Sequence, residues 1–155
     1  MKGYKIGFSE TDDNGDLRLC YALIELEVPE RYPGAKYFSS DYKNRSNVAR
    51  VLKINKIAII SVLLDEPIVK VTREHLDSAF SLFDPNFCYR PGEIVYPDRF
   101  EDQPFICANG IHFFTYRQLA IDYVMDDWTV SKFTERVLEK EILRPVAVEK
   151  KGIDF

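Results

Sequence analysis

An Asn-Gly pair lies between two strand-like stretches and limits what the beginning of the chain can form. Residues Lys2–Phe8 and Leu17–Val28 carry the residue pattern of β-strands. Asn14 and Gly15 tolerate the positive φ angles that a tight hairpin turn requires. The sequence therefore predicts an N-terminal β-hairpin. The acidic residues of Asp12–Asp16 have the look of a calcium loop, but their spacing is wrong and no glutamate closes the loop.

Further strand patterns follow the hairpin. Pro29 and Pro33 end the second strand, and the polar stretch Ser39–Asn47 is predicted to be turn-like. Val48–Ile54 then resumes a β-branched, alternating pattern. The apolar run Ile57–Leu64 is too short to span a membrane and is rich in isoleucine and valine. We therefore expect a central strand buried on both faces, with a buried helix as the alternative.

The middle of the chain is dense in turn signals. Val69 and Val71 indicate a short strand, and Thr72–Phe83 is predicted to form a brief helix that begins at a threonine N-cap. Beyond it, short strands alternate with proline-containing turns: strands at Phe87–Arg90, Glu93–Tyr96 and Phe105–Cys107, and turns at Asp84–Asn86, Pro91–Gly92 and Pro97–Asp98. Turns this frequent predict a compact β-layer.

The last third of the chain changes from a strand period to a helical period. Ile111–Phe114 is predicted to be a strand, and Thr115 with Gln118 fits a capping box at the start of a helix that reaches Tyr123. The elements predicted after it are a second helix over Val130–Leu143, ended by Pro145, and a last strand over Val146–Val148.

Length and composition are those of one globular domain. The chain has 155 residues, of which 46% are hydrophobic and 30% charged, and no linker or low-complexity tract interrupts it. We therefore predict one α+β domain over residues 1–155. It is expected to consist of a mostly antiparallel sheet with an N-terminal β-hairpin and two C-terminal helices.

Charge and cysteine usage limit the classes of function. The formal net charge is −4, so nucleic acid is a disfavoured partner despite the basic segment Lys43–Lys56. Cys20, Cys88 and Cys107 are odd in number and lack a Cys-x-x-Cys spacing, which indicates neither a disulfide framework nor a zinc site. The opening residues Met1–Tyr4 do not lead into the apolar stretch of a signal peptide. We expect a cytoplasmic protein with no membrane partner.

The two histidines offer little for metal binding or catalysis. His75 lies among charged residues and is interpreted as a surface residue. His112 alternates with Ile111 and Phe113 on the predicted strand, so its ring is expected on the opposite face, and a structural role is favoured over a functional one. With two histidines in different elements, no metal site is expected.

Arg90 is a further candidate for ligand binding. It precedes Pro91–Gly92, in a turn from which a guanidinium can reach an anion, although pairing with Glu93 or Asp98 is the favoured interpretation. Gly92 and Gly110 are isolated glycines and form no phosphate-binding loop, and the chain has no Gly-x-Ser-x-Gly sequence. The common nucleotide-binding and hydrolase signatures are therefore absent.

The stretches Tyr89–Phe100 and Cys107–Phe114, together with Lys43–Ile54, resemble an uncharacterised domain of giant-virus and phage proteins, sometimes found beside pentapeptide repeats. The string Cys-x-x-Gly-Ile-His-Phe-Phe is the specific part of this resemblance. It implies viral ancestry, a location in the host-cell cytoplasm and an accessory role, without a known activity.

The stretch Gly110-Ile111-His112-Phe113 before a helix, with Tyr123 further on, is similar to the ADP-ribosyltransferase fold. In poly(ADP-ribose) polymerases of that fold, Gly-Ile-Tyr-Phe precedes a helix and a later tyrosine stacks on nicotinamide. The similarity implies NAD as a cofactor, bound by Tyr89, Gly110 and Tyr123, with Arg90, His112 and Glu149 as catalytic candidates. The chain departs from that pattern because no His-Gly-Ser or His-Gly-Thr precedes it, His112 replaces the tyrosine, and the catalytic glutamate has no clear counterpart.

Two functions follow from these observations. The first is a non-catalytic accessory module that binds a protein partner or a small molecule and needs no cofactor. It is favoured by the absence of a strong catalytic constellation. The alternative is an NAD-binding enzyme of the ADP-ribosyltransferase type, which predicts that Arg90, His112 and Tyr123 border one cleft.

Overall fold

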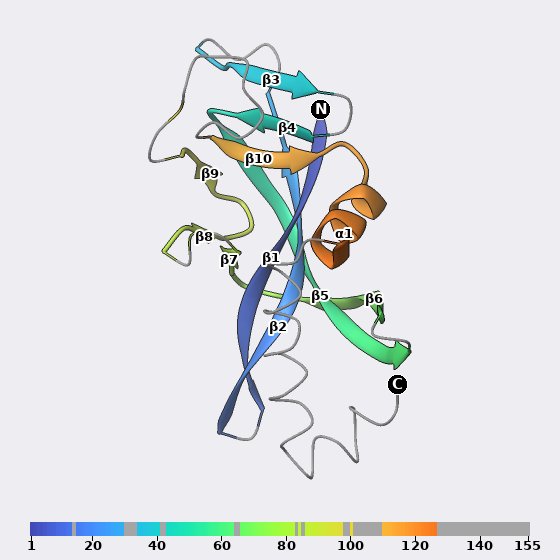
Figure 1. Ribbon diagram of the computed structural model, residues 1–155. Helices are drawn as coiled ribbons and strands as arrows, with labels where there is room; N and C mark the ends of the chain where they lie inside the picture. The colour runs from blue at the N-terminus through green and yellow to red at the C-terminus, as the bar shows by residue number, and fades with distance from the viewer. Residues whose placement is uncertain are drawn as a thin grey trace.

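The computed structural model describes residues 1–13, 15–29, 34–40, 43–63, 66–82, 84, 86–97, 100 and 110–126. A ten-stranded sheet, antiparallel at every pairing between its strands, dominates this part of the chain and is strongly twisted and curled (Figure 1). The strands are β1 (Lys2–Asp13), β2 (Asp16–Glu27), β3 (Tyr37–Ser40), β4 (Lys43–Ser46), β5 (Ala49–Leu63), β6 (Glu66–His75), β7 (Ala79–Ser81), β8 (Cys88–Tyr89), β9 (Ile94–Val95) and β10 (Ile111–Phe114). One helix, α1 (Arg117–Asp126), lies among the described residues.

The N-terminal hairpin lies in the middle of the sheet. The strand order is β3-β4-β10-β1-β2-β5-β6, and β1 pairs with β2 over its whole length, from Lys2 opposite Glu27 to Asp13 opposite Asp16. The short strand β7 pairs with a stretch of β1 next to the one that β10 occupies. The short strand β9 pairs with a stretch of β5 next to the one that β6 occupies. β1 is therefore flanked on its outer edge by two segments distant in sequence, β10 and β7, whereas β5 is flanked by β6, which follows it in the chain, and by the more distant β9.

Two hydrophobic clusters cover the two faces of the sheet because apolar side chains alternate along β2. On one face, which we call the outer core, the β7–β9 segment covers the sheet; on the other, the helix-side core, α1 packs against β1 and β10 (Figure 1). The outer core includes Ile24, Leu26, Val51, Ile54, Tyr89, Ile111 and Phe113. The helix-side core includes Ile6, Tyr21, Leu23, Ile57, Phe114, Ala120 and Ile121.

Most of the predicted strands are confirmed. The hairpin forms with Gly15 at a φ of 87°, and Ile111–Phe114 is β10. Residues 49–54 and 57–63 of these two predicted strands belong to a single 15-residue strand, β5. The alternative of a buried helix for the apolar run is therefore wrong. Of the side chains in that run, Ile57 is buried, and those from residue 59 onward lie outside the described part of the structure.

The prediction of a turn-like region over Ser39–Asn47 is wrong, since most of this stretch forms the hairpin of β3 and β4. Three of its polar side chains are buried, those of Asn44, Arg45 and Ser46. Ser46 Oγ donates a hydrogen bond to the Val48 carbonyl at 2.8 Å. The Arg45 guanidinium lies 4.6 Å from the ring centroid of Phe38 and 5.0 Å from that of Phe100. Stacking on aromatic rings lets an arginine occupy a buried strand position.

The helix predicted over Thr72–Phe83 is also wrong. β6 runs to His75, and β7 follows at Ala79–Ser81. The Thr72 hydroxyl, predicted to cap a helix, donates instead to the carbonyl of Lys56 on the neighbouring strand at 2.8 Å. A threonine at a strand position thus satisfies its hydroxyl across the sheet.

The C-terminal predictions are confirmed for one helix. α1 begins at Arg117, and the first helical hydrogen bond runs from the Ala120 N–H to the Tyr116 carbonyl at 3.3 Å. Tyr116 therefore occupies the N-cap position in place of Thr115. The side chain of Gln118 is directed along the helix, where it donates to Asp122 at 2.8 Å. The predicted strand Phe105–Cys107, second helix Val130–Leu143 and last strand Val146–Val148 lie outside the described residues.

Candidate ligand-binding site

Two of the residues suggested by the transferase resemblance lie at the β8–β9 turn. Tyr89 is buried in the outer core, and Arg90 is exposed in the turn that follows. The Glu93 N–H donates to the Arg90 carbonyl at 3.1 Å, and Gly92 has a φ of 88°, so the predicted Pro-Gly turn is confirmed.

The other candidates belong to β10 and α1. Tyr123 lies in the helix-side core, with its ring centroid 5.1 Å from that of Phe114. His112 is half-buried and shares a face of β10 with Phe114 by strand alternation. Gly110 lies beside Arg45 at the start of β10. The structure thus places His112 and Tyr123 on one face of the sheet and Tyr89 on the other, while Glu149 lies outside the described residues.

Tyr89 instead contacts a lysine on the central strand. Lys5 Nζ donates to the Tyr89 hydroxyl at 2.7 Å and lies 4.9 Å from the centroid of its ring. Burial lowers the pKa of Lys5 to about 8, although part of the residue reaches the surface. Burial, reinforced by the Asp84 carboxylate, raises the pKa of Tyr89. At neutral pH the pair is a buried ammonium bonded to a neutral phenol.

A cavity of about 380 Å³ opens on the helix-side face of the sheet. None of the five described candidates named above lines it. The side chains that do come from four strands and the first residue of α1: Tyr4, Leu23, Glu25, Lys53, Asn55, Val71, Thr72, Arg73, His75 and Arg117. This cavity is large enough to hold a small organic molecule.

Strand register explains why these side chains meet. Glu25 on β2 lies directly opposite Tyr4 on β1 and Lys53 on β5. One row further along the sheet, Asn55 lies between Leu23 and His75. Because directly opposite residues of antiparallel strands point to the same face, the two rows form a continuous floor for the cavity.

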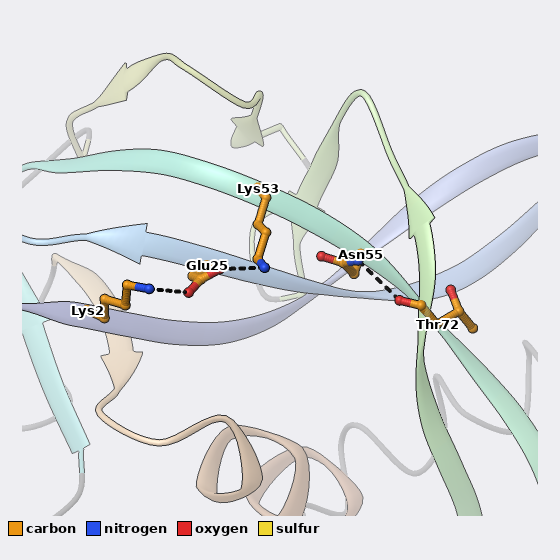
Figure 2. A network of polar contacts seen from close by, with 5 residues as sticks. All are labelled: Lys2, Glu25, Lys53, Asn55 and Thr72. Carbon is orange, nitrogen blue, oxygen red and sulfur yellow. Dashed lines mark hydrogen bonds and ion pairs between the residues drawn. The ribbon is translucent and has the colours of Figure 1, made fainter.

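A buried carboxylate occupies the centre of this floor. Glu25 is 7% exposed, and its two oxygens pair with Lys2 at 3.2 Å and Lys53 at 3.4 Å (Figure 2). The side chains of the two lysines are 64% and 52% exposed, so the ion pairs extend from a buried acid to solvent. Burial of Glu25 is compensated by these two charges.

An irregularity between β5 and β6 forms the wall beside this floor. Asn55 pairs with His75 and Ile57 with Val71, so Lys56 alone faces the three residues Thr72–Glu74. Side chains hold this bulge: Asn55 Nδ2 donates to the Thr72 carbonyl at 3.1 Å (Figure 2), and the Glu74 N–H donates to Thr72 Oγ1 at 3.2 Å. Bulges change the direction of strand side chains and are frequent beside binding sites. This bulge brings Thr72 and Arg73 into the lining of the cavity.

The hydrogen bonds that hold the bulge predict that the hydroxyl of Thr72 contributes to stability. Replacing Thr72 with valine keeps the shape of the side chain but removes a donor and an acceptor. We expect the free energy of unfolding to fall by about 1–2 kcal/mol, measured by urea denaturation. Thr115→Val, at a half-buried threonine outside the cavity, is the matched control and should change it by less than about half as much. Equal effects of the two substitutions would contradict a special role for the Thr72 hydroxyl.

The cavity carries an excess of positive charge. Lys53, Arg73 and Arg117 line it against the single carboxylate of Glu25, in a chain whose formal net charge is −4. Arg117 is the first residue of α1, whose first turn contains no acidic side chain. A cation at a helix N-terminus adds to the positive end of the helix dipole. The site therefore favours an anion.

Sequence reasoning proposed none of the ten cavity residues as a site. His75 was interpreted as a surface residue, and it is exposed, but it also lines the cavity. A signal for Glu25 was present, since it is a lone charge within the apolar strand segment Leu23–Leu26. The converging of Arg73 and Arg117 depends on pairing between strands and on the position of α1, which spacing alone does not reveal.

Two structural absences concern the described residues alone. In that part of the chain, no three His, Cys, Asp or Glu side chains gather where they could hold a metal ion. No helix among the described residues is long enough and apolar enough to cross a membrane.

Comparison with known proteins gives a family match. The sequence model of a family of unknown function (DUF5758) matches residues 1–120. No curated protein and no solved structure matches the chain. The matched range contains every residue that lines the cavity.

Proposed function

Because the chain belongs to DUF5758, a family of unknown function, we propose a role for it from its own cavity: it is a non-catalytic module that binds a small anionic ligand. The observation that carries this proposal is the group of Lys53, Arg73 and Arg117 around one cavity of an acidic chain. Clustered cations that line a concave surface raise the local concentration of anions and direct their approach.

The make-up of the cavity supports a binding role. Its volume of about 380 Å³ lies in the range of small-molecule sites. Tyr4, Leu23 and Val71 supply apolar surface, while Asn55 and Thr72 supply polar groups whose positions are fixed by the bulge. The groups that the bulge holds in place lose little conformational entropy when a ligand binds.

The other roles considered from the sequence have less support. Viral ancestry and a protein partner rest on the sequence resemblance alone. An NAD-binding transferase would need Tyr89 and Tyr123 near one ligand, and these residues lie in the cores on opposite faces of the sheet. NAD binding is the less supported alternative, and the test of the proposed function includes it.

The test is a titration of the protein with inorganic phosphate at low ionic strength, followed by calorimetry. We expect saturable binding, and we expect Arg73→Gln to weaken it about tenfold, because a charge-assisted hydrogen bond to the anion is lost. Arg50→Gln is the matched control. Arg50 is an exposed arginine of β5 that does not line the cavity, so its loss should leave the affinity within a factor of about two.

Two outcomes would overturn the proposal. Absence of saturable phosphate binding would show that the cavity is not an anion site. Equal weakening of phosphate binding by Arg73→Gln and Arg50→Gln would show that the attraction comes from the general charge of the chain and not from the cavity. A rise in melting temperature with NAD that Tyr123→Ala abolishes and Arg73→Gln leaves intact would favour the transferase alternative.

A further inference from the structure

We propose that the ligand of the cavity is a sugar phosphate, whose phosphate group is held by the arginines and whose hydroxyl groups donate to Glu25. This inference rests on the proposed function and adds the identity of the ligand's uncharged part. It starts from Glu25, because a site for a bare anion has no use for a carboxylate in its floor.

Glu25 has unused capacity to accept hydrogen bonds. A carboxylate offers about four lone-pair directions, two on each oxygen. Lys2 occupies one oxygen and Lys53 the other, each with one contact. One direction on each oxygen remains for a ligand, which matches the two parallel donors of a vicinal diol. A ligand that uses these two directions leaves both ion pairs in place, so the buried carboxylate keeps the two charges that compensate it.

The charge around Glu25 selects against the alternatives. A simple cation or amine would meet Lys53, Arg73 and Arg117 as well as the carboxylate, and the net repulsion would exclude it. An inorganic anion would be attracted by the arginines and repelled by Glu25. A molecule with an anionic group at one end and hydroxyl donors at the other satisfies both kinds of side chain at once.

Size and surface fit the same class of ligand. A phosphate group fills only a small part of a cavity of about 380 Å³, so the remaining space needs an organic body. Tyr4 and Leu23 lie beside Glu25 in the floor, one opposite it on β1 and one two residues before it on β2. An aromatic ring beside a carboxylate offers the CH face of a sugar a surface to pack on while its hydroxyl groups reach the acid.

The experiment compares three probes by calorimetry on the full chain: inorganic phosphate, ribose 5-phosphate and 2-deoxyribose 5-phosphate. We expect ribose 5-phosphate to bind at least about tenfold more tightly than the other two, because hydrogen bonds to a charged acceptor are among the stronger ones. Glu25→Gln should remove that preference. The same substitution should leave the binding of inorganic phosphate unchanged or make it tighter, because it removes a negative charge from the site.

The comparison of the three probes on the wild-type protein keeps the test valid even if Glu25→Gln does not fold. Equal affinity of the wild-type protein for all three probes would overturn the inference and leave the proposed anion-binding function intact. Equal weakening of ribose 5-phosphate and inorganic phosphate by Glu25→Gln would also overturn it. Absence of binding for every probe would overturn the proposed function itself.

Discussion

Replacing Phe113 with alanine is expected to lower the free energy of unfolding by about 3–5 kcal/mol. Phe113 is fully buried in the outer core together with Ile111. Its ring lies directly on Gly3 of β1, which has no side chain to fill the space that removal of the ring leaves. The loss of stability therefore includes both the free energy gained by burying the ring away from water and most of the cost of the cavity left behind. Urea denaturation with an unchanged m-value is the measurement.

Gly3 supplies a test of this explanation. A Cβ at Gly3 would lie 2.5 Å from the Phe113 ring, so Gly3→Ala should destabilise the wild-type protein. In the Phe113→Ala protein the same methyl group would enter the new cavity, and the penalty should shrink or change sign. Tyr116→Ala, at a residue 68% exposed, is the control for loss of an aromatic ring and should cost less than about 0.5 kcal/mol. Additive effects of the Gly3 and Phe113 substitutions would show that the two residues do not share this space.

The second large effect concerns Lys5 and pH. Its pKa of about 8 in the folded state lies below the ordinary value of 10.5, so folding disfavours the protonated amine. The unfolded chain binds more protons between these two values, and stability therefore rises as the pH increases from about 8 to 10.5. The whole rise is at most about 3 kcal/mol. Tyr89 acts in the opposite direction above pH 10, because its raised pKa keeps the folded phenol protonated where the unfolded one ionises.

Lys5→Met separates this contribution from those of other groups. At pH 7 we expect the variant to be more stable than the wild type by about 1–2 kcal/mol, because relief of the buried charge outweighs the lost hydrogen bond to Tyr89. The difference should shrink as the pH approaches 10. Urea midpoints measured at pH 7, 8, 9 and 10 provide the comparison. A difference that stays constant with pH would mean that Lys5 keeps its ordinary pKa in the folded protein.

The strands that sequence analysis predicted correctly are those specified by local pattern. The hairpin of β1 and β2 follows from the Asn-Gly turn signal in the sequence, and β10 follows from a run of four residues of which three are apolar. The errors fell where pairing with distant strands overrides local composition. Polar residues such as Asn44 and Arg45 look like a turn, yet β10 and β3 place them in the sheet. Thr72 looks like a helix N-cap until Lys56 supplies a carbonyl for its hydroxyl.

The candidate site was less accessible to sequence reasoning than the fold. Its side chains come from β1, β2, β5, β6 and α1, and they meet through strand register rather than through a contiguous motif. The shift between β5 and β6 depends on Asn55 and Thr72, which lie 17 positions apart and match no known signature. A lone glutamate in an apolar strand was the one local sign of the site.

The position of β10 also determines when this sheet can be completed during synthesis. β10 lies between β1 and β4, so within the described sheet the β3–β4 hairpin joins the rest of the strands through a segment that the ribosome makes more than 60 residues later. Domains emerge at about 5–20 residues per second, so the edges of β1 and β4 wait several seconds for their partner. During that interval the newly made chain exposes two unpaired strand edges to other chains. Nascent chains that end before residue 111 are therefore the ones for which chaperone contact matters most.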